Sequence, residues 1–427
     1  MNAIFYTLGC KVNQYETQVM RELLQKDGFT CDEDSTSDIV VINSCTVTAE
    51  SDRKTRQAVR RYRRKYPDAI IILTGCMVQA FPQQAKLLGE ADIIFGNHDI
   101  SKIADYIKEF LKDRKQIVDI VDHKKGDLYN TPYICNFSER TRAHIKIEDG
   151  CERYCTYCII PTARGCVRSR PLDEIRAEAE KLAKNGFSEI VLVGINLSAY
   201  GKDTPYNLCD AVETVCSVNC ILRVRLGSLE PDHITDDMLK RFKAQEKFCP
   251  QFHLSLQSGC DKTLKRMNRH YDSDFYADLV ARIRNIFHSA AITTDIMVGF
   301  AGETEEEFSE SLQFVKSVGF ARAHIFAYSK RSGTVAAGLK SQVENSVKEA
   351  RSKLMYAATR DSELSFLKSQ IGTTVPVLFE TVAKGHFEGY TPNYTRVTVN
   401  DDRIICGKIF DVLITDAAND HCIGKLI

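Results

Sequence analysis

Short apolar runs alternate with helically spaced stretches over the first part of this chain of 427 residues. The apolar runs cover residues 4–8, 38–43, 69–74 and 92–95. Strands that alternate with amphipathic helices are typical of βαβ units on a parallel sheet. The sequence therefore predicts an N-terminal α/β domain over residues 1–125, followed by a linker over residues 126–140.

The same alternation resumes after the linker and predicts a larger domain over residues 141–366. Candidate strands lie at residues 143–147, 189–193, 222–226, 252–256, 292–298 and 323–328. Residues 171–184 and 303–318 have the spacing of amphipathic helices. Six strands with helices between them predict an incomplete β/α barrel of the TIM type, with its active site at the carboxyl ends of the strands.

The last part of the chain, residues 367–427, has a different pattern. A helical stretch over 343–369 is followed by β-type runs at residues 374–379, 395–399, 404–406 and 408–414. Glycines separate these runs, so we expect a small antiparallel β-barrel. Such barrels often bind nucleic acid, and Phe387, Tyr390 and Tyr394 either stack on bases or pack in the barrel core.

Composition and charge limit the class of protein. The chain has no apolar run long enough to cross a membrane and no signal-peptide pattern, so we expect a cytoplasmic protein with no membrane partner. Its 16 cysteines are then expected to be reduced and available for metal–sulfur chemistry. The net charge is zero, so binding to nucleic acid requires a local basic patch.

Three closely spaced cysteines follow the first strand of the central domain. Cys151, Cys155 and Cys158 have the spacing C-x3-C-x2-C. Cysteine thiolates are the usual ligands of a 4Fe–4S cluster, and three of them leave one iron open. A structural zinc site would need a fourth ligand, for which Cys166 is the nearest candidate. A disulfide is disfavoured because nothing else indicates an oxidising compartment.

Three further cysteines follow strands of the N-terminal domain. Cys10, Cys45 and Cys76 each lie at the carboxyl end of a predicted strand. In parallel sheets this edge is where ligands bind, so cysteines far apart in sequence can converge there. The alternative is that they are ordinary buried thiols. We expect a second iron–sulfur cluster on this triad.

A basic run lies between the second and third strands. It contains Arg53, Lys54, Arg56, Arg60, Arg61, Arg63 and Arg64, and no acidic residue interrupts it. A charged run is often no more than a solvated helix face. The density of this one also suits a face that binds the phosphates of RNA.

Polar residues end the later strands of the predicted barrel. These strand ends lie at the carboxyl mouth of the barrel, where polar groups can bind a zwitterionic ligand. The candidate residues are Gly194, Asn196, Ser228, Glu230 and Gln257. The motif Cys151 to Cys158, with Tyr157 before its last cysteine, resembles that of the radical S-adenosylmethionine (radical SAM) enzymes. This resemblance implies that SAM binds the open iron, with Tyr157 against its adenine, and is cleaved to a 5′-deoxyadenosyl radical.

The chain as a whole resembles the methylthiotransferases, a radical SAM subfamily. The matching segments are residues 9–13, 43–47, 75–76, 151–161, 164–165, 169–170, 228–231, 256–259, 267–269, 299–303 and 328–334. The resemblance implies a C-terminal TRAM domain that binds RNA. It also implies two 4Fe–4S clusters, SAM as cosubstrate and methyl donor, and an electron donor such as flavodoxin or ferredoxin. The auxiliary cluster, on Cys10, Cys45 and Cys76, would be where the transferred sulfur is methylated.

Branches of this family differ in substrate. One acts on isopentenyladenosine in tRNA, one on threonylcarbamoyladenosine in tRNA, and one on an aspartate of a ribosomal protein. The isopentenyl branch typically has Gln and Glu where this chain has Ile195 and Val167, and the chain looks more like the threonylcarbamoyl branch. Ala301 replaces a usual proline. The resemblance implies methylthiolation at carbon 2 of N6-threonylcarbamoyladenosine at tRNA position 37. The alternative outside the enzymes is a non-catalytic RNA-binding protein with a structural zinc ion.

Overall fold

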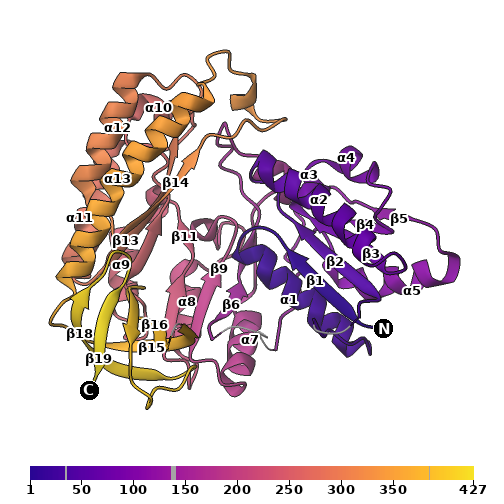
Figure 1. The fold of residues 1–427 in the computed structure, drawn as a ribbon, viewed down its shortest axis with the longest axis horizontal. Helices are drawn as coiled ribbons and strands as arrows, with labels where there is room; N and C mark the ends of the chain where they lie inside the picture. The colour runs from indigo at the N-terminus through magenta and orange to yellow at the C-terminus, as the bar shows by residue number, and fades with distance from the viewer. Residues whose placement is uncertain (34–35, 136–140, 384) are drawn as a thin grey trace.

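A computed structural model of the chain describes residues 1–33, 36–135, 141–383 and 385–427. The N-terminal part contains one parallel sheet with the strand order β1-β2-β3-β4-β5 (Figure 1). Its strands are β1 (Ala3–Thr7), β2 (Ile39–Ser44), β3 (Ile70–Gly75), β4 (Ile93–Phe95) and β5 (Ile117–Asp119). Its helices are α1 (Lys11–Lys26), α2 (Ala49–Lys65), α3 (Cys76–Ala80), α4 (Pro82–Lys86), η1 (Ile100–Lys102) and α5 (Ile103–Asp113). The predicted α/β fold is confirmed, although the sequence pattern did not reveal the short strand β5.

The central part contains the six parallel strands that the sequence predicts. They are β6 (Ala143–Lys146), β9 (Glu189–Val193), β10 (Arg223–Leu226), β12 (Gln251–Leu254), β13 (Ala291–Val298) and β14 (Arg322–Ala327). Two sheets, β10-β9-β6 and β11-β12-β13-β14, meet through a parallel bridge between Val224 and Phe248. Their curved row in Figure 1 is an open β/α barrel, as predicted.

Helices and short strands connect these strands. The helices are α6 (Ile160–Arg164), α7 (Leu172–Lys184), η2 (Leu197–Ala199), α8 (Leu208–Cys216), η3 (Pro231–His233), α9 (Asp236–Lys243), α10 (Asp261–Arg266), α11 (Ser273–Ile286), α12 (Glu305–Val318) and η4 (Val335–Gly338). The short strands are β7 (Glu148–Asp149), β8 (Arg168–Ser169) and β11 (Ser228–Leu229). Local sequence defines α12 well: Thr304 and Glu307 form a capping box, and Gly319 ends the helix in the left-handed conformation.

The long helix α13 (Asn345–Ser369) leads into a closed barrel of five strands. These are β15 (Thr374–Ala383), β16 (His386–Tyr390), β17 (Arg396–Val399), β18 (Ile409–Ala417) and β19 (Cys422–Leu426). The barrel is antiparallel as predicted, except that β17 and β19 pair in parallel. The expected strand at residues 404–406 is wrong: Ile404 is buried and packs in the barrel core from a turn, so its apolar side chain imitated a strand signal. The sequence pattern also did not reveal β16 and β19.

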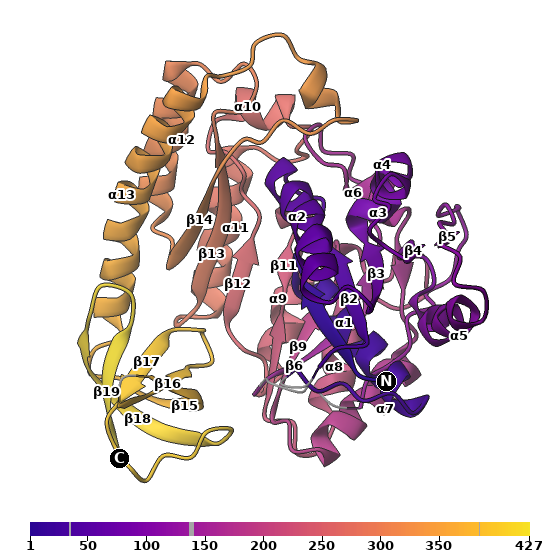
Figure 2. The ribbon, with the colours of Figure 1, turned by 45° about the vertical axis from the view of Figure 1, so that its right-hand side comes forward.

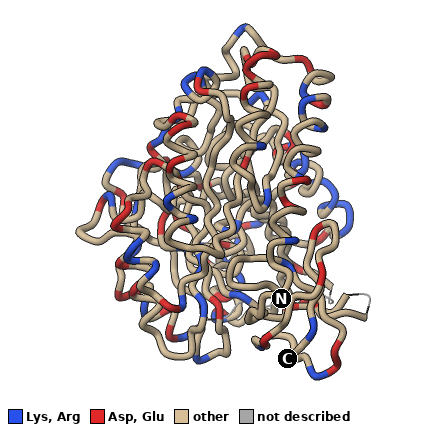
Figure 3. Tube along the Cα trace, turned by 90° about the vertical axis from the view of Figure 1, so that its left-hand side faces the viewer, with Lys and Arg blue, Asp and Glu red and all other residues tan. Residues whose placement is uncertain are grey.

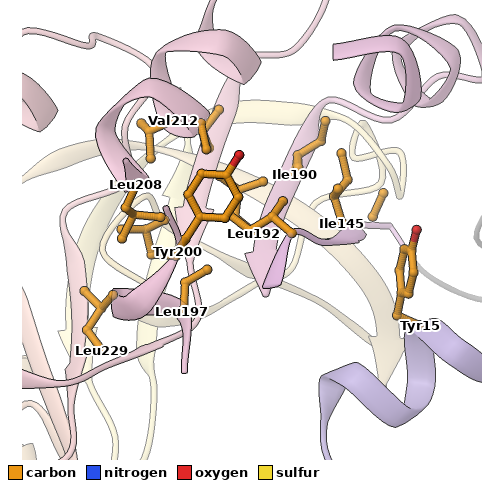
Figure 4. Close-up of a cluster of buried hydrophobic side chains, with 14 of the residues drawn as sticks. Tyr15, Ile145, Ile190, Leu192, Leu197, Tyr200, Leu208, Val212 and Leu229 are labelled. Carbon is orange, nitrogen blue, oxygen red and sulfur yellow. The ribbon is translucent and has the colours of Figure 1, made fainter. Parts of the chain in front are cut away.

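One hydrophobic core crosses the boundary between the first two parts. Tyr15 and Val19 of α1 belong to the same buried cluster as Ile145 of β6 and Leu192 of β9. Figure 4 shows the ring of Tyr15 on α1 near Ile145, with the central core beyond it. The N-terminal part is therefore packed against the open barrel along α1, as the view in Figure 2 also shows.

The C-terminal barrel packs against the open barrel through buried arginines. Arg223 and Arg225 of β10 donate hydrogen bonds to backbone carbonyls of Pro376, Tyr390 and Pro392 at 2.6–2.9 Å. Charges of both signs are interspersed over the face shown in Figure 3, in keeping with the zero net charge. None of the helices in the described ranges is both long and apolar enough to traverse a lipid bilayer.

Candidate iron–sulfur and SAM site

The loop that carries Cys151, Cys155 and Cys158 follows β6 and β7 at the carboxyl mouth of the open barrel. It starts at Gly150, whose φ is +94° and where a Cβ atom would lie 1.9 Å from the carbonyl oxygen of Cys166. Only glycine fits this position, so the approach of the two loop segments depends on it. Backbone hydrogen bonds from Cys151 to Gly165 (3.0 Å) and from Thr156 to Met267 (3.0 Å) then fix the loop.

A buried arginine contacts this triad. Nη1 of Arg269 donates to Sγ of Cys155 at 3.3 Å, while its guanidinium also pairs with Glu230 and donates to the carbonyl of Ser255. Glu230, a predicted SAM contact, therefore reaches the triad through Arg269. A cation that donates to sulfur favours the thiolate form, which is the form that binds iron.

Burial opposes that thiolate form when no cation is bound. The pKa of Cys151 and that of Cys158 are raised to about 12, mainly by burial and in part by the neighbouring thiols of the triad. Three crowded thiols that resist ionisation in isolation are expected to lose their protons to a bound metal cation. The donor set therefore fits an iron–sulfur cluster.

The N-terminal triad converges as the strand ends predict. Cys10 precedes α1, Cys45 follows β2 directly and Cys76 follows β3 directly. A Cβ atom placed on Gly9 would lie 3.2 Å from Sγ of Cys45, so the Cys10 segment lies against Cys45. Burial is the main cause that raises the pKa of Cys45, and the Cys76 thiol adds to it. The parallel sheet thus brings together three cysteines that are far apart in sequence.

A second buried arginine contacts this triad. Nε of Arg164 donates to Sγ of Cys76 at 3.2 Å, and its guanidinium pairs with Glu16 of α1 and with Asp149. Lys146 pairs with the same two carboxylates at 2.8 and 2.7 Å. Burial raises the pKa of Cys76 to about 11, and the charge of Arg164 counters this shift. A cation that donates to Sγ of Cys76 favours its thiolate form, so this triad also fits a cluster.

The remaining predicted SAM contacts surround the central loop. Gly194 lies against the carboxyl group of Glu148, which accepts a hydrogen bond from the backbone N–H of Asn196 at 2.7 Å. Oδ1 of Asn196 and Oε1 of Glu148 are buried and have no partner among the described residues. Burial raises the pKa of Glu148 well above its usual value, which favours the protonated carboxyl group, a form that can donate to a ligand.

The last three predicted contacts lie in different surroundings. Tyr157 packs edge-on against Phe300, with ring centroids 6.3 Å apart. Ser228 is exposed and lines a cavity of about 720 Å³ together with Gly194 and Cys10. Gln257 is left-handed, with φ +68°, and its backbone bonds to Asp295 and Met297. Gly194 and Asn196 thus follow β9 of one sheet, whereas Ser228 and Gln257 belong to the other sheet, at β11 and beside β13.

Only some residues of the basic run are available on the exposed face of α2, because several are engaged by neighbouring groups. Arg63 is bound to Asp92 and to backbone carbonyls, and Arg61 lies over the rings of Tyr6 and Tyr62. Arg53 pairs with Glu50, and Arg60 with Glu90 at 3.2 Å. Lys54 and Arg64 are exposed, and Arg56 is half-buried. The helical period places Arg56, Arg60 and Arg64 in one stripe along the helix.

Two functional residues have no signal in the sequence alone. Arg164 and Arg269 lie in segments that the family resemblance singles out, but the resemblance gives them no role. Each contacts a cysteine that is 88 or 114 residues away, so no local spacing could reveal the contact. Only the folded structure shows that each of these buried arginines lies beside a cysteine of one of the triads.

Comparisons with known proteins agree with this geometry. Residues 145–315 match the model of the radical SAM superfamily, and residues 2–96 match that of the uncharacterized protein family UPF0004. The fold is similar to the radical SAM methyltransferase TsrM from Kitasatospora setae, with a TM-score of 0.56 and 14% identity over 76% of this chain and 72% of that one. An open barrel with a cysteine triad at its mouth defines this protein as a radical SAM enzyme with an iron–sulfur cluster that uses SAM.

Relatives that align over nearly the whole chain identify its family within the radical SAM enzymes. The chain is 36% identical to the threonylcarbamoyladenosine tRNA methylthiotransferase MtaB of Bacillus subtilis, over 99% of this chain and 96% of the relative. The MtaB protein of Thermotoga maritima is 37% identical over 98% and 95%. The tRNA-2-methylthio-N(6)-dimethylallyladenosine synthase of Natranaerobius thermophilus is 33% identical over 99% and 96%. The chain belongs to the radical SAM methylthiotransferase family.

Proposed function

We propose that this protein is a tRNA methylthiotransferase that converts N6-threonylcarbamoyladenosine at position 37, next to the anticodon, into its 2-methylthio derivative. The observation that carries the proposal is the 36–37% identity, over nearly the whole chain, to relatives named for this substrate. Relatives named for dimethylallyladenosine follow at 31–33% identity. The alternatives are isopentenyladenosine in tRNA and an aspartate of a ribosomal protein.

We assign one 4Fe–4S cluster to each cysteine triad. When bound, the central cluster with SAM supplies the radical that removes hydrogen from an unreactive C–H bond, and the auxiliary cluster supplies the sulfur. The chain's own part is to orient these groups. Arg269 and Arg164 each donate a hydrogen bond to one cysteine sulfur of a triad, and Glu148 with Asn196 presents buried polar atoms for the SAM that would bind beside Gly194.

This assignment gives each domain of the chain a role. Residues 1–125 carry the auxiliary triad, 141–366 the radical SAM site and 367–427 a TRAM domain that binds RNA, with 126–140 as the linker; residues 136–140 of that linker lie outside the described residues. We further propose a cytoplasmic enzyme that receives electrons from a flavodoxin or a ferredoxin. Tyr390 and Tyr394 stack on each other with centroids 4.7 Å apart and pack under Arg142, while Phe387 packs against Phe379 in the barrel. We therefore place RNA contacts on other residues of the barrel.

The test is a product assay with the anaerobically purified and reconstituted protein. We expect about eight iron and eight sulfide per chain, four for each cluster. With SAM and a reductant, tRNA that carries threonylcarbamoyladenosine should gain a methylthio group, detected by mass spectrometry of its nucleosides. Product on isopentenyladenosine alone, or on a ribosomal protein alone, would contradict the substrate. A colourless zinc protein that leaves SAM intact would contradict the enzyme class.

The stripe of Arg56, Arg60 and Arg64 on α2 is expected to contact RNA phosphates. Changing all three to glutamine should weaken tRNA binding and reduce the slope of log Kd against log salt by about one for each phosphate that the variant no longer neutralises. Filter binding between low and moderate salt measures this slope. The matched control changes three exposed lysines on other helices, Lys184, Lys240 and Lys316. An equal loss in the control would show that net charge alone, rather than this stripe, is responsible.

A further inference from the structure

The inner face of the second sheet carries polar side chains where a barrel core would ordinarily be apolar. His253 lies on β12, Thr293 and Asp295 on β13, and Arg322 and His324 on β14. The strand register pairs His253 with Thr293, Thr293 with Arg322, and Asp295 with His324. Residues two apart on a strand point to the same side, so these five share one face.

This face lines the cavity of about 720 Å³ that also reaches the auxiliary triad. Gly9, Cys10 and Lys11 border the cavity at the start of α1, and Gly194 and Ser228 border it at the mouth of the open barrel. A volume of this size is typical of a small-molecule site. A group held on the inner face of the sheet therefore lies in the same cavity as the cysteine that we assign to the sulfur-donating cluster.

The charges around this cavity are unequal. Asp295 is the acidic residue of its lining, against the basic residues Lys11, His253, Arg225, Arg322 and His324. The carboxylate of Asp295 is engaged by His253, with Nε2 and Oδ2 3.2 Å apart, and Nδ1 of His253 lies 3.0 Å from Oγ1 of Thr293. These two contacts fix the ring of His253 between Asp295 and Thr293.

Arg322 and His324 are the basic groups left to face the cavity from β14. In the described part of the chain the nearest ion-pair partner of Arg322 is Glu363, at 4.0 Å, and 61% of the arginine side chain is exposed. The ligand atoms of His253, Asp295 and His324 lie within 4.8 Å of one another. Burial lowers the pKa of His324; the charge of Asp295 raises it, and the charges of His253, Arg322 and Lys11 lower it. Arg322 is therefore the cation of β14 that an anion in this cavity can meet, with His324 beside it as a hydrogen-bonding group.

We propose that Arg322 and His324 bind the carboxylate of the threonylcarbamoyl substituent and so select this substrate. The inference rests on the proposed function and adds its specificity determinant. The substituent offers a carboxylate, a hydroxyl and a urea group to a polar wall, and a guanidinium can bind a carboxylate through two hydrogen bonds. A dimethylallyl substituent offers none of these groups and would leave the polar wall unpaired, which is a strong basis for discrimination.

The experiment compares two anticodon stem–loop RNAs as substrates of the reconstituted full-length enzyme. One carries threonylcarbamoyladenosine, and the other carries its methyl ester, which removes the negative charge. We expect the wild-type enzyme to prefer the acid over the ester by about 10- to 100-fold in kcat/KM, mainly through KM, as expected when a charged hydrogen bond is removed. In Arg322→Gln and in His324→Gln this preference should fall to about threefold or less.

The control is Lys316→Gln, an exposed lysine on α12 that does not line the cavity, which should keep the wild-type preference. Iron content and melting temperature report whether each variant is folded and loaded. A preference for the acid that survives in both variants overturns this inference alone. A wild-type enzyme that makes no product from the acid overturns the proposed function as well. A non-iron metal ion that is bound by the wild type and released in His324→Gln also overturns the inference, because the group of His253, Asp295 and His324 would then be a metal site.

Discussion

Replacing Cys45 by alanine is expected to separate the two half-reactions. The variant should still cleave SAM to 5′-deoxyadenosine, because Cys151, Cys155 and Cys158 lie on a different loop. It should form no methylthio product, because the triad with Cys10 and Cys76 then lacks one ligand. Iron should fall from about eight to about four per chain. Anaerobic assays of 5′-deoxyadenosine and of the modified nucleoside, with an iron determination, measure all three quantities.

The matched control is Cys209→Ala. Cys209 is buried on α8, in the hydrophobic core and outside both triads. Its replacement should cost some stability but retain about eight iron per chain and both activities. Retained methylthio transfer in Cys45→Ala would falsify the assignment of a cluster to the N-terminal triad.

Replacing Cys155 by alanine is expected to abolish both activities together. Cys155 is the middle cysteine of the central triad, and it is the one that receives the hydrogen bond from Arg269. Without it, SAM cleavage and methylthio transfer should both fall to background, while about four iron per chain remain on the N-terminal triad. The same three assays apply. A variant that still cleaves SAM would show that the cluster needs fewer ligands from this loop than proposed.

The sequence predicts the structure best where the same local pattern recurs along the chain. The six strands of the open barrel each combine an apolar run with a polar or glycine end, and all six are predicted. The cysteine at the end of β2 and the one at the end of β3 can be aligned because parallel strands end at one edge. The short strand β5 (Ile117–Asp119) is not predicted, since three residues at a sheet edge carry too little periodicity.

The parts that could not be predicted depend on contacts between distant segments. Arg164 contacts Cys76 and Glu16, and Arg269 contacts Cys155, across separations that no spacing rule covers. The ion pair between Glu230 and Arg269 is likewise invisible to spacing; the ligand contact that the strand end predicts for Glu230 stays a prediction. His253, Asp295 and His324 form a group only because three neighbouring strands place them on one face.

The buried ion pairs of α1 also bear on the order in which the molecule is made. Glu16 leaves the ribosome 130 residues before Lys146 and 148 residues before Arg164, its two buried partners. The hydroxyl of Tyr15 bonds to Glu178, which is 163 residues further on. A carboxylate is costly to bury before its counter-charge is present. This face of α1 therefore gains its buried partners only once residues up to 178 have been synthesised, and residues 1–125 alone would leave Glu16 without the counter-charges of Lys146 and Arg164.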